Sequence, residues 1–180
     1  MKIQLDSGLY KEVDALRVVG GAGVNVSSTE VPGDTPDLEV TLASNFIELG
    51  YAEVTTNLSI TSTAESSPDD VVSLPARTYS GTEIVLIEFF CYDVLVAANA
   101  AGNGINVNLW DMDGPTNLGR MAAIEFPSAA IFEAGLSGRF RTTPAAGQHT
   151  YRARAWRRNA ACTLVGNGGI PIYLRASRVG

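Results

Sequence analysis

Residues 83–97 of the chain read EIVLIEFFCYDVLVA, and this stretch carries the strongest strand signal in the sequence. One set of alternating positions consists of Val85, Ile87, Phe89 and Cys91. The other set is also apolar, apart from Glu88, and consists of Ile84, Leu86, Phe90, Tyr92 and Val94. A strand that is apolar on both faces is usually buried on both faces. In a two-layer protein we therefore expect its outer face to be covered by a loop or by another subunit.

Shorter alternating segments lie on both sides of this stretch, at spacings of about ten residues. They comprise residues 51–56, 58–62, 71–74, 105–110, 118–126, 138–142, 149–158, 162–165 and 172–179. The pair Asp113-Gly114 is a hairpin turn signal, and no long segment has the helical period. Many short strands at this spacing predict an all-β fold, namely a jelly-roll-like antiparallel β-sandwich over residues 44–180.

Residues 1–43 differ from the rest because they contain few large apolar side chains. Their short alternating segments are separated by the run Gly20-Gly21-Ala22-Gly23 and by a turn region rich in Pro, Gly and Asp. A stretch of this kind lacks the apolar surface for a core of its own. We interpret residues 1–43 as an N-terminal β-strand attachment or trimerising segment that precedes the sandwich domain.

The charges of the chain are unevenly distributed. The net charge is -6, but all 19 acidic residues lie between Asp6 and Glu133, and every charged residue after Glu133 is an arginine. Such asymmetry is typical either of a nucleic-acid-binding tail or of basic strands that pair with acidic ones, within a chain or across a subunit boundary. Because arginine is preferred over lysine in planar, partly buried contacts, we favour the pairing and expect no nucleic-acid partner.

Residues 149–158 provide the best candidate binding face. Tyr151, Ala153 and Ala155 alternate with Arg152, Arg154 and Trp156. Arg and Trp are favoured at the centres of interfaces, so the second set could contact phosphate, an anionic glycan or an acidic strand. We favour pairing with Glu or Asp of a neighbouring subunit.

No motif points to catalysis or to a cofactor. His149 is the only histidine and has no nucleophile-elbow motif beside it, so we expect a structural or surface role. Residues 110–114, WDMDG, resemble part of a calcium loop, but Ala122 stands where the terminal glutamate would fall. Asp69-Asp70 is interpreted as part of a solvated loop. We therefore expect no enzymatic activity, no metal and no cofactor.

Cys91 and Cys162 are the only cysteines. Both lie in apolar strand-like segments, which favours buried free thiols over a disulfide. The sequence opens without the apolar core of a secretory signal, and no run approaches the ~18 apolar residues of a membrane span. We expect a protein that is made in the cytoplasm, without export or membrane insertion.

Two stretches near the C-terminus have a distinctive pattern. Residues 141–156 read RTTPAAGQHTYRARAW, and residues 170–179 read IPIYLRASRV. The first is similar to the P-x-A-G-x-H-T-Y-x-x-x-A stretch of small bacteriophage virion proteins, and the second resembles their closing strand. Residues 48–52, with Asp113-Gly114 and residues 118–120, fit the same pattern. Residues 8–13, GLYKEV, resemble the G-x-W/Y-K/R-x-V element of tail-tip and minor tail proteins, with Tyr10 where Trp is commoner. The chain lacks the long shaft of a fibre.

The resemblance implies a virion surface protein, a homotrimer of β-sandwiches held by a small N-terminal element. The expected interface residues are Ile84, Leu86, Phe90, Tyr92, Arg152, Arg154 and Trp156, and the expected virion-attachment residues are Leu9, Tyr10, Val13, Leu16 and Val18. We expect a tail-fibre or tail-tip appendage, with other virion proteins and a host cell-surface glycan as candidate partners. The alternatives are a capsid decoration protein or head fibre and, from a different class, a free, monomeric carbohydrate-binding module.

Overall fold

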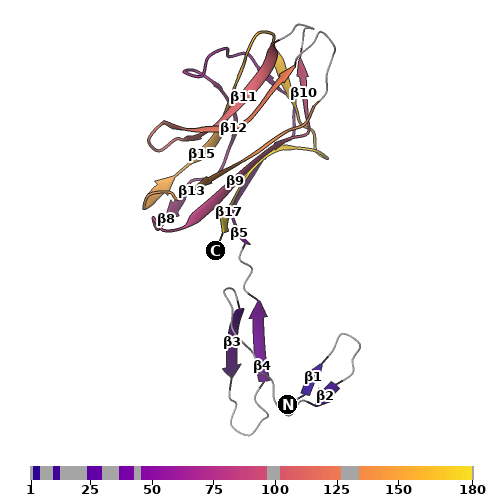
Figure 1. Cartoon of the computed structure of the whole chain (residues 1–180), viewed down its shortest axis with the longest axis vertical. Coiled ribbons are helices and arrows are strands. Elements are labelled where there is room, and N and C mark those ends of the chain that lie inside the picture. The colour runs from indigo at the N-terminus through magenta and orange to yellow at the C-terminus, as the bar shows by residue number, and fades with distance from the viewer. Residues whose placement is uncertain are drawn as a thin grey trace. The chain divides into compact units, whose positions relative to one another are not determined.

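The computed structural model describes four strands near the N-terminus and then residues 46–96, 102–126 and 134–179 (Figure 1). The chain divides into two compact units, Met1–Asn45 and Phe46–Gly180. This division lies next to the boundary after residue 43 that the composition predicts. Within the described residues all regular elements are strands, so the predicted all-β class is confirmed.

The first unit contains two antiparallel strand pairs. Strand β1 (Lys2–Gln4) pairs with β2 (Tyr10–Glu12), and β3 (Val24–Thr29) pairs with β4 (Asp37–Leu42). Of the predicted attachment residues, Tyr10 begins β2. The other four lie outside the described residues, namely Leu9, Val13, Leu16 and Val18. The attachment role of this unit stays a prediction.

The second unit is an antiparallel β-sandwich of two four-stranded sheets. Sheet I has the order β13-β9-β17-β5 and consists of β13 (Leu136–Thr142), β9 (Ile84–Cys91), β17 (Ile172–Val179) and β5 (Phe46–Val54). Sheet II has the order β12-β11-β15-β7 and consists of β12 (Thr116–Phe126), β11 (Asn103–Asp111), β15 (Tyr151–Arg157) and β7 (Asp69–Ser73). Apart from the hairpin of β11 and β12, neighbouring strands are distant in sequence, as in a jelly roll.

Two smaller sheets complete this unit. Strands β10 (Asp93–Val96), β16 (Cys162–Val165) and β6 (Leu58–Ile60) form one of them, in that order. Strands β14 (Gly147–His149) and β8 (Arg77–Tyr79) form the other. The Asp113-Gly114 pair lies in the turn between β11 and β12, where the sequence predicts a hairpin.

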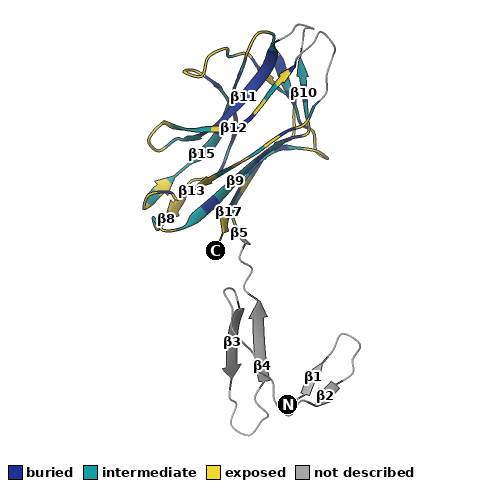
Figure 2. Ribbon diagram, viewed as in Figure 1, coloured by how far each residue is buried: buried dark blue, intermediate teal, exposed yellow. Residues whose placement is uncertain are grey.

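The core consists of side chains buried in the second unit (Figure 2). Strand β9 contributes its first alternating set, of which Val85, Ile87 and Cys91 are fully buried and Phe89 is 1% exposed. Strands β11 and β15 contribute a second group, which consists of Ile105, Val107, Leu109, Tyr151, Ala153 and Ala155. Burying each large apolar side chain stabilises the fold by about 1.5–3 kcal/mol. The alternation of apolar residues in the sequence predicts which side chains of these strands face the core.

The second alternating set of β9 is only partly covered. Ile84, Leu86 and Phe90 are half-buried, and Tyr92 is 57% exposed. The sequence predicts that Val94 shares a strand face with these residues, and this is wrong. Strand β9 ends at Cys91, and Val94 is fully buried in β10. The Val94 amide donates to the carbonyl of Ala134 (3.1 Å), which helps to hold the chain in its new direction.

A glycine allows β12 and β13 to approach closely. A Cβ atom added to Gly138 of β13 would lie 1.9 Å from the carbonyl oxygen of Met121 in β12. No side chain fits at that distance. Gly138 therefore permits the edge of sheet I to lie against sheet II along this side of the sandwich.

Cys91 and Cys162 are both buried and free, as the sequence predicts. Burial raises the pKa of both thiols. Each thiol stays protonated near neutral pH and acts as a small apolar side chain in the core.

Candidate functional site: the outer faces of the two sheets

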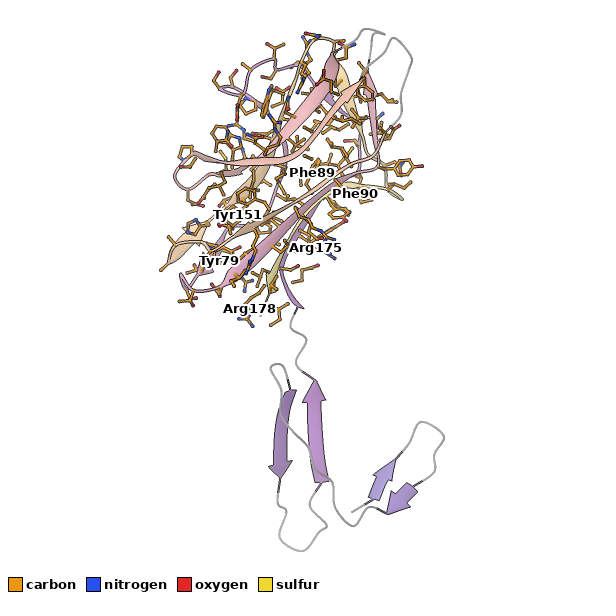
Figure 3. The ribbon with its side chains drawn as sticks, viewed as in Figure 1. Tyr79, Phe89, Phe90, Tyr151, Arg175 and Arg178 are labelled. Atoms are coloured by element: carbon orange, nitrogen blue, oxygen red, sulfur yellow. The ribbon has the colours of Figure 1, made fainter. Side chains whose placement is uncertain are left out.

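The outer face of sheet I brings together side chains from all four of its strands. We define this face by Ser137, Arg139 and Arg141 of β13, Ile84, Leu86, Glu88 and Phe90 of β9, Tyr173, Arg175, Ser177 and Val179 of β17, and Glu48, Tyr51 and Glu53 of β5. Alternation explains the arrangement, because successive residues of a strand point to opposite faces. Phe89 and Phe90, which are neighbours in sequence, therefore lie on different sides of β9 (Figure 3).

Glu88 of β9 lies between two arginines that stand opposite it on the neighbouring strands. It lies opposite Arg139 and Arg175, and its carboxylate accepts from Arg139 Nε (2.8 Å) and from Arg175 Nη2 (2.6 Å). The pKa of Glu88 is lowered, mainly by the hydrogen bonds from Arg175. Burial acts in the opposite direction but is outweighed. The Glu88 side chain is 13% exposed, whereas that of Arg139 is 73% exposed.

An aromatic row lies beside this ionic one. The rings of Phe90 and Tyr173 stack with their centroids 5.3 Å apart, and those of Tyr51 and Tyr173 lie 5.7 Å apart. The Tyr51 hydroxyl donates to Glu53 (2.6 Å), and this hydrogen bond raises the pKa of Tyr51 to about 12. Ser137 faces Phe90 from the other side, on β13.

A groove of about 480 Å³ opens beside the Phe90 ring. Ser137 is small, so β13 leaves space there, and Glu88, Arg139 and Tyr173 are among the other lining residues. The groove thus combines aromatic rings with a carboxylate, a guanidinium group and a hydroxyl. This combination can receive a sugar ring or a side chain of another protein.

The other end of the face is aliphatic. Ile84 lies opposite Val179, and Leu86 lies opposite Ser177. Val179 is 37% exposed, and Ile84 and Leu86 are half-buried. The sequence predicts that a loop or another subunit covers this face, and in the single chain its apolar side chains still contact water.

On the outer face of sheet II, two of the arginines pair with a carboxylate of the same chain. Arg152 and Arg154 both bind the carboxylate of Asp70, with 2.7 Å between Arg154 Nε and Asp70 Oδ1. The Arg154 guanidinium group also donates to the Pro68 carbonyl (2.9 Å) and lies over the Trp110 ring, 5.0 Å from its centroid. The favoured pairing with a carboxylate of a neighbouring subunit is therefore wrong for these two arginines. The reason is the register, which places Asp70 of β7 opposite Arg154.

Other residues of this face support the same arrangement. Trp156 is 9% exposed and is thus mostly withdrawn from the surface. Asp69, interpreted from the sequence as part of a solvated loop, instead begins β7 and accepts from the amides of Thr61 (2.6 Å) and Ser62 (2.9 Å). These bonds tie the segment before β7 to the sheet.

His149 is held at the end of β14 between two acceptors. Its Nδ1 lies 2.5 Å from Asp111 Oδ2, and its Nε2 lies 3.0 Å from the Ala145 carbonyl oxygen. Burial works to lower the pKa of His149, but the hydrogen bonds to Asp111 and Ala145 outweigh it and the pKa is raised. Because both acceptors lack a proton to donate, the geometry favours an imidazolium ion that donates from both nitrogens.

The described residues contain no group of three or more His, Cys, Asp or Glu side chains placed to hold a metal ion. In the same part of the chain, no helix has the length and apolar character to cross a membrane.

The sequence matches no protein-family model and no curated protein. Among solved structures, Eiger TNF from S. frugiperda is 11% identical, with a TM-score of 0.44 over 75% of this chain and 93% of that one. The CBM22-1 and GH10 modules of a Clostridium thermocellum endo-1,4-beta-D-xylanase, complexed with xylohexaose, are 8% identical, with a TM-score of 0.30 over 74% of this chain and 29% of that one. The CBM22-1 xylan-binding domain from Paenibacillus barcinonensis is 17% identical, with a TM-score of 0.22 over 72% and 86%.

Proposed function

We propose that this chain is a structural protein of a bacteriophage virion, an appendage of the tail in which several copies, three in our expectation, associate through their β-sandwich units. The observation that carries the proposal is the outer face of sheet I. There, Ile84, Leu86, Phe90 and Val179 remain in contact with water although they are large and apolar.

The physical reason for association is the gain from covering that surface. Each Å² of apolar surface removed from water contributes about 25 cal/mol. Contiguous apolar patches rimmed by polar groups are typical of interaction sites. Here the apolar side chains lie between arginines on β13 and glutamates on β5, in two groups on either side of the ion pair between Glu88 and Arg175.

The division of the chain into two units supports an appendage. A small unit of short strand pairs comes first, and the larger sandwich follows. In such an arrangement the first unit attaches to the particle and the second is displayed. The similarity of residues 141–156 and 170–179 to phage virion proteins supports the proposal that the particle is a bacteriophage virion.

Sugar binding is a second candidate function, and the groove beside Phe90 favours it. Sugars pack their C–H faces on aromatic rings and direct hydroxyls to charged groups, and the groove offers Phe90 and Tyr173 with Glu88 and Arg139. An appendage with this site would contact glycans of the host surface, and a free module with it would be a carbohydrate-binding protein.

Two measurements test the appendage proposal. Light scattering coupled to gel filtration of the full chain should give the mass of a trimer at micromolar concentration, and a monomer would contradict self-association. Antibody labelling of intact virions, viewed by electron microscopy, should place the protein on the tail. Label on the capsid would favour head decoration instead, and virions without label would contradict the proposal.

A further inference from the structure

Charge is distributed across the outer face of sheet I from one edge to the other. Arg139 and Arg141 lie on β13, at one edge of the sheet, and both are exposed. Glu48 and Glu53 lie on β5, at the opposite edge, and they are exposed as well. We call these pairs the basic edge and the acidic edge. The apolar centre between them consists of Ile84, Leu86, Phe90, Tyr173 and Val179, and the ion pair between Glu88 and Arg175 crosses it.

The two edges are too far apart to neutralise each other within one chain. Adjacent strands lie about 4.8 Å apart, so three spacings separate β13 from β5 by roughly 14 Å. Exposed charges at such a distance are largely screened at physiological salt. The charges at the centre of the sheet are already paired, because Glu88 binds Arg175 and Arg139. Glu48 acts on Arg175 electrostatically and Glu53 accepts from the Tyr51 hydroxyl, but both glutamates are exposed, so their carboxylates remain accessible to guanidinium groups of another molecule.

One cross-strand row displays this arrangement most simply. Arg141 lies opposite Leu86, Leu86 lies opposite Ser177, and Ser177 lies opposite Glu48. The row thus carries a positive charge at one end, a leucine in its interior and a negative charge at the other end. A second copy that presents its acidic edge to this basic edge meets an opposite charge at each contact.

We propose that the outer face of sheet I is the contact between copies of this chain: the basic edge of one copy meets the acidic edge of the next, and their apolar centres pack together. This inference rests on the self-association in the proposed function, and it names the surface through which the copies associate. The apolar centre supplies the attraction, and the edges fix the orientation, because like charges at a mismatched contact repel. A partner of this kind also fills the groove beside Phe90.

Charge reversal at the two ends of the Arg141 row tests the inference. We expect Arg141→Glu and Glu48→Arg each to weaken self-association of the full chain by about tenfold, measured by sedimentation across a dilution series. The double variant restores opposite charges at the contact and should return to within about threefold of the original dissociation constant. Among the described residues neither Arg141 nor Glu48 forms an ion pair, and melting curves will check that each variant is folded.

Arg120→Glu is the matched control. Arg120 is an exposed arginine on β12 of sheet II, and its reversal changes the net charge by the same amount without touching either edge. We expect no change in association from this control.

Each contrary outcome has a distinct meaning. If the original chain is oligomeric and both reversals leave its dissociation constant unchanged, the inference is overturned while the proposed appendage stands. If the original chain is monomeric at all concentrations, self-association itself is overturned. A monomer that binds xylose, glucose or N-acetylglucosamine in a manner abolished by Phe90→Ala would overturn the inference in favour of a sugar site.

Discussion

The outer faces of the two sheets contain similar residue types but use them differently. On sheet II, Arg152 and Arg154 share Asp70 of the same chain, and Arg154 also covers Trp110. On sheet I, the exposed arginines and glutamates lie on opposite edges with apolar side chains between them. A cluster of arginine and tryptophan is therefore a poor marker of an interface when the fold supplies its carboxylate. We expect the interface instead at the apolar side chains of sheet I, between charges that the chain leaves apart.

The comparison leads to a sharp expectation for Leu86→Glu, which places a charge in the apolar centre. We expect self-association to weaken by about 100-fold, since removing a carboxylate from water costs several kcal/mol even where Arg141, its cross-strand neighbour, is available to pair with it. The melting temperature should change little because Leu86 is only half-buried. Sedimentation and calorimetry measure the two quantities.

Ala123→Glu provides the control for that variant. Ala123 is exposed on β12, where it lies opposite Asn106, so the same carboxylate is added to an outward position of sheet II. An equal loss of association in both variants would contradict the expectation that copies associate through sheet I and not through sheet II.

On sheet II, Asp70→Ala should act on stability and leave association unchanged. The substitution leaves Arg152 and Arg154, whose side chains are 28% and 21% exposed, without their shared carboxylate. We expect the free energy of unfolding to fall by about 1–2 kcal/mol, because hydrogen bonds to charged groups are stronger than neutral ones and Asp70 itself is half exposed. Urea denaturation measures this change.

Glu125→Ala is the appropriate comparison. Glu125 and Arg158 form an ion pair whose side chains are 52% and 40% exposed. Surface pairs of this kind are worth about 0–1 kcal/mol. A loss as large as that of Asp70→Ala would show that the Asp70 cluster has no special role.

A smaller effect is expected from pH, through His149. Because the pKa of His149 is raised in the folded protein, the protonated ring stabilises the fold fully below about pH 6.5, its value in an unfolded chain. That contribution is lost as the pH rises through the folded-state pKa. His149→Gln should remove this part of the slope in a series of urea denaturations between pH 6 and pH 9. An unchanged slope would mean that another group is responsible.

The smallest effect is expected for Arg139→Ala. This arginine binds Glu88, but its side chain is 73% exposed and Arg175 still holds the carboxylate. We expect the unfolding free energy to fall by less than about 0.5 kcal/mol. Association should weaken measurably, since the basic edge loses one charge. A loss of stability without any change in association would contradict the proposal that the basic edge contacts another copy.

Local alternation in the sequence predicts the sandwich and its inner layer well. The set Val85, Ile87 and Phe89 is buried where the pattern of β9 places it, and β15 alternates around Ala153 as expected. The error at Val94 has a long-range cause. The apolar run continues in sequence, but the chain turns after Cys91 because Asp93–Val96 pairs with β16. Nothing within residues 83–97 signals that pairing.

The partners of the charged residues were harder to predict. Asp70 and Arg154 are 84 residues apart in sequence, so the register of β7 against β15 decides their contact. The same holds for Glu88 and Arg175, which are 87 residues apart. Alternation in residues 172–179 could have placed Tyr173 and Arg175 on an outer face. Only the order of strands in sheet I reveals that Phe90 and Glu88 are their neighbours.

Oxidative footprinting of the full chain by hydroxyl radicals tests the central claim most directly, with peptides analysed by mass spectrometry at nanomolar and at micromolar concentration. We expect oxidation of Leu86, Phe90 and Tyr173 to fall at the higher concentration as copies cover sheet I, while that of Trp110 on sheet II stays constant. Oxidation of all four side chains that is independent of concentration, across a range in which the mass of the particle rises, would contradict the account.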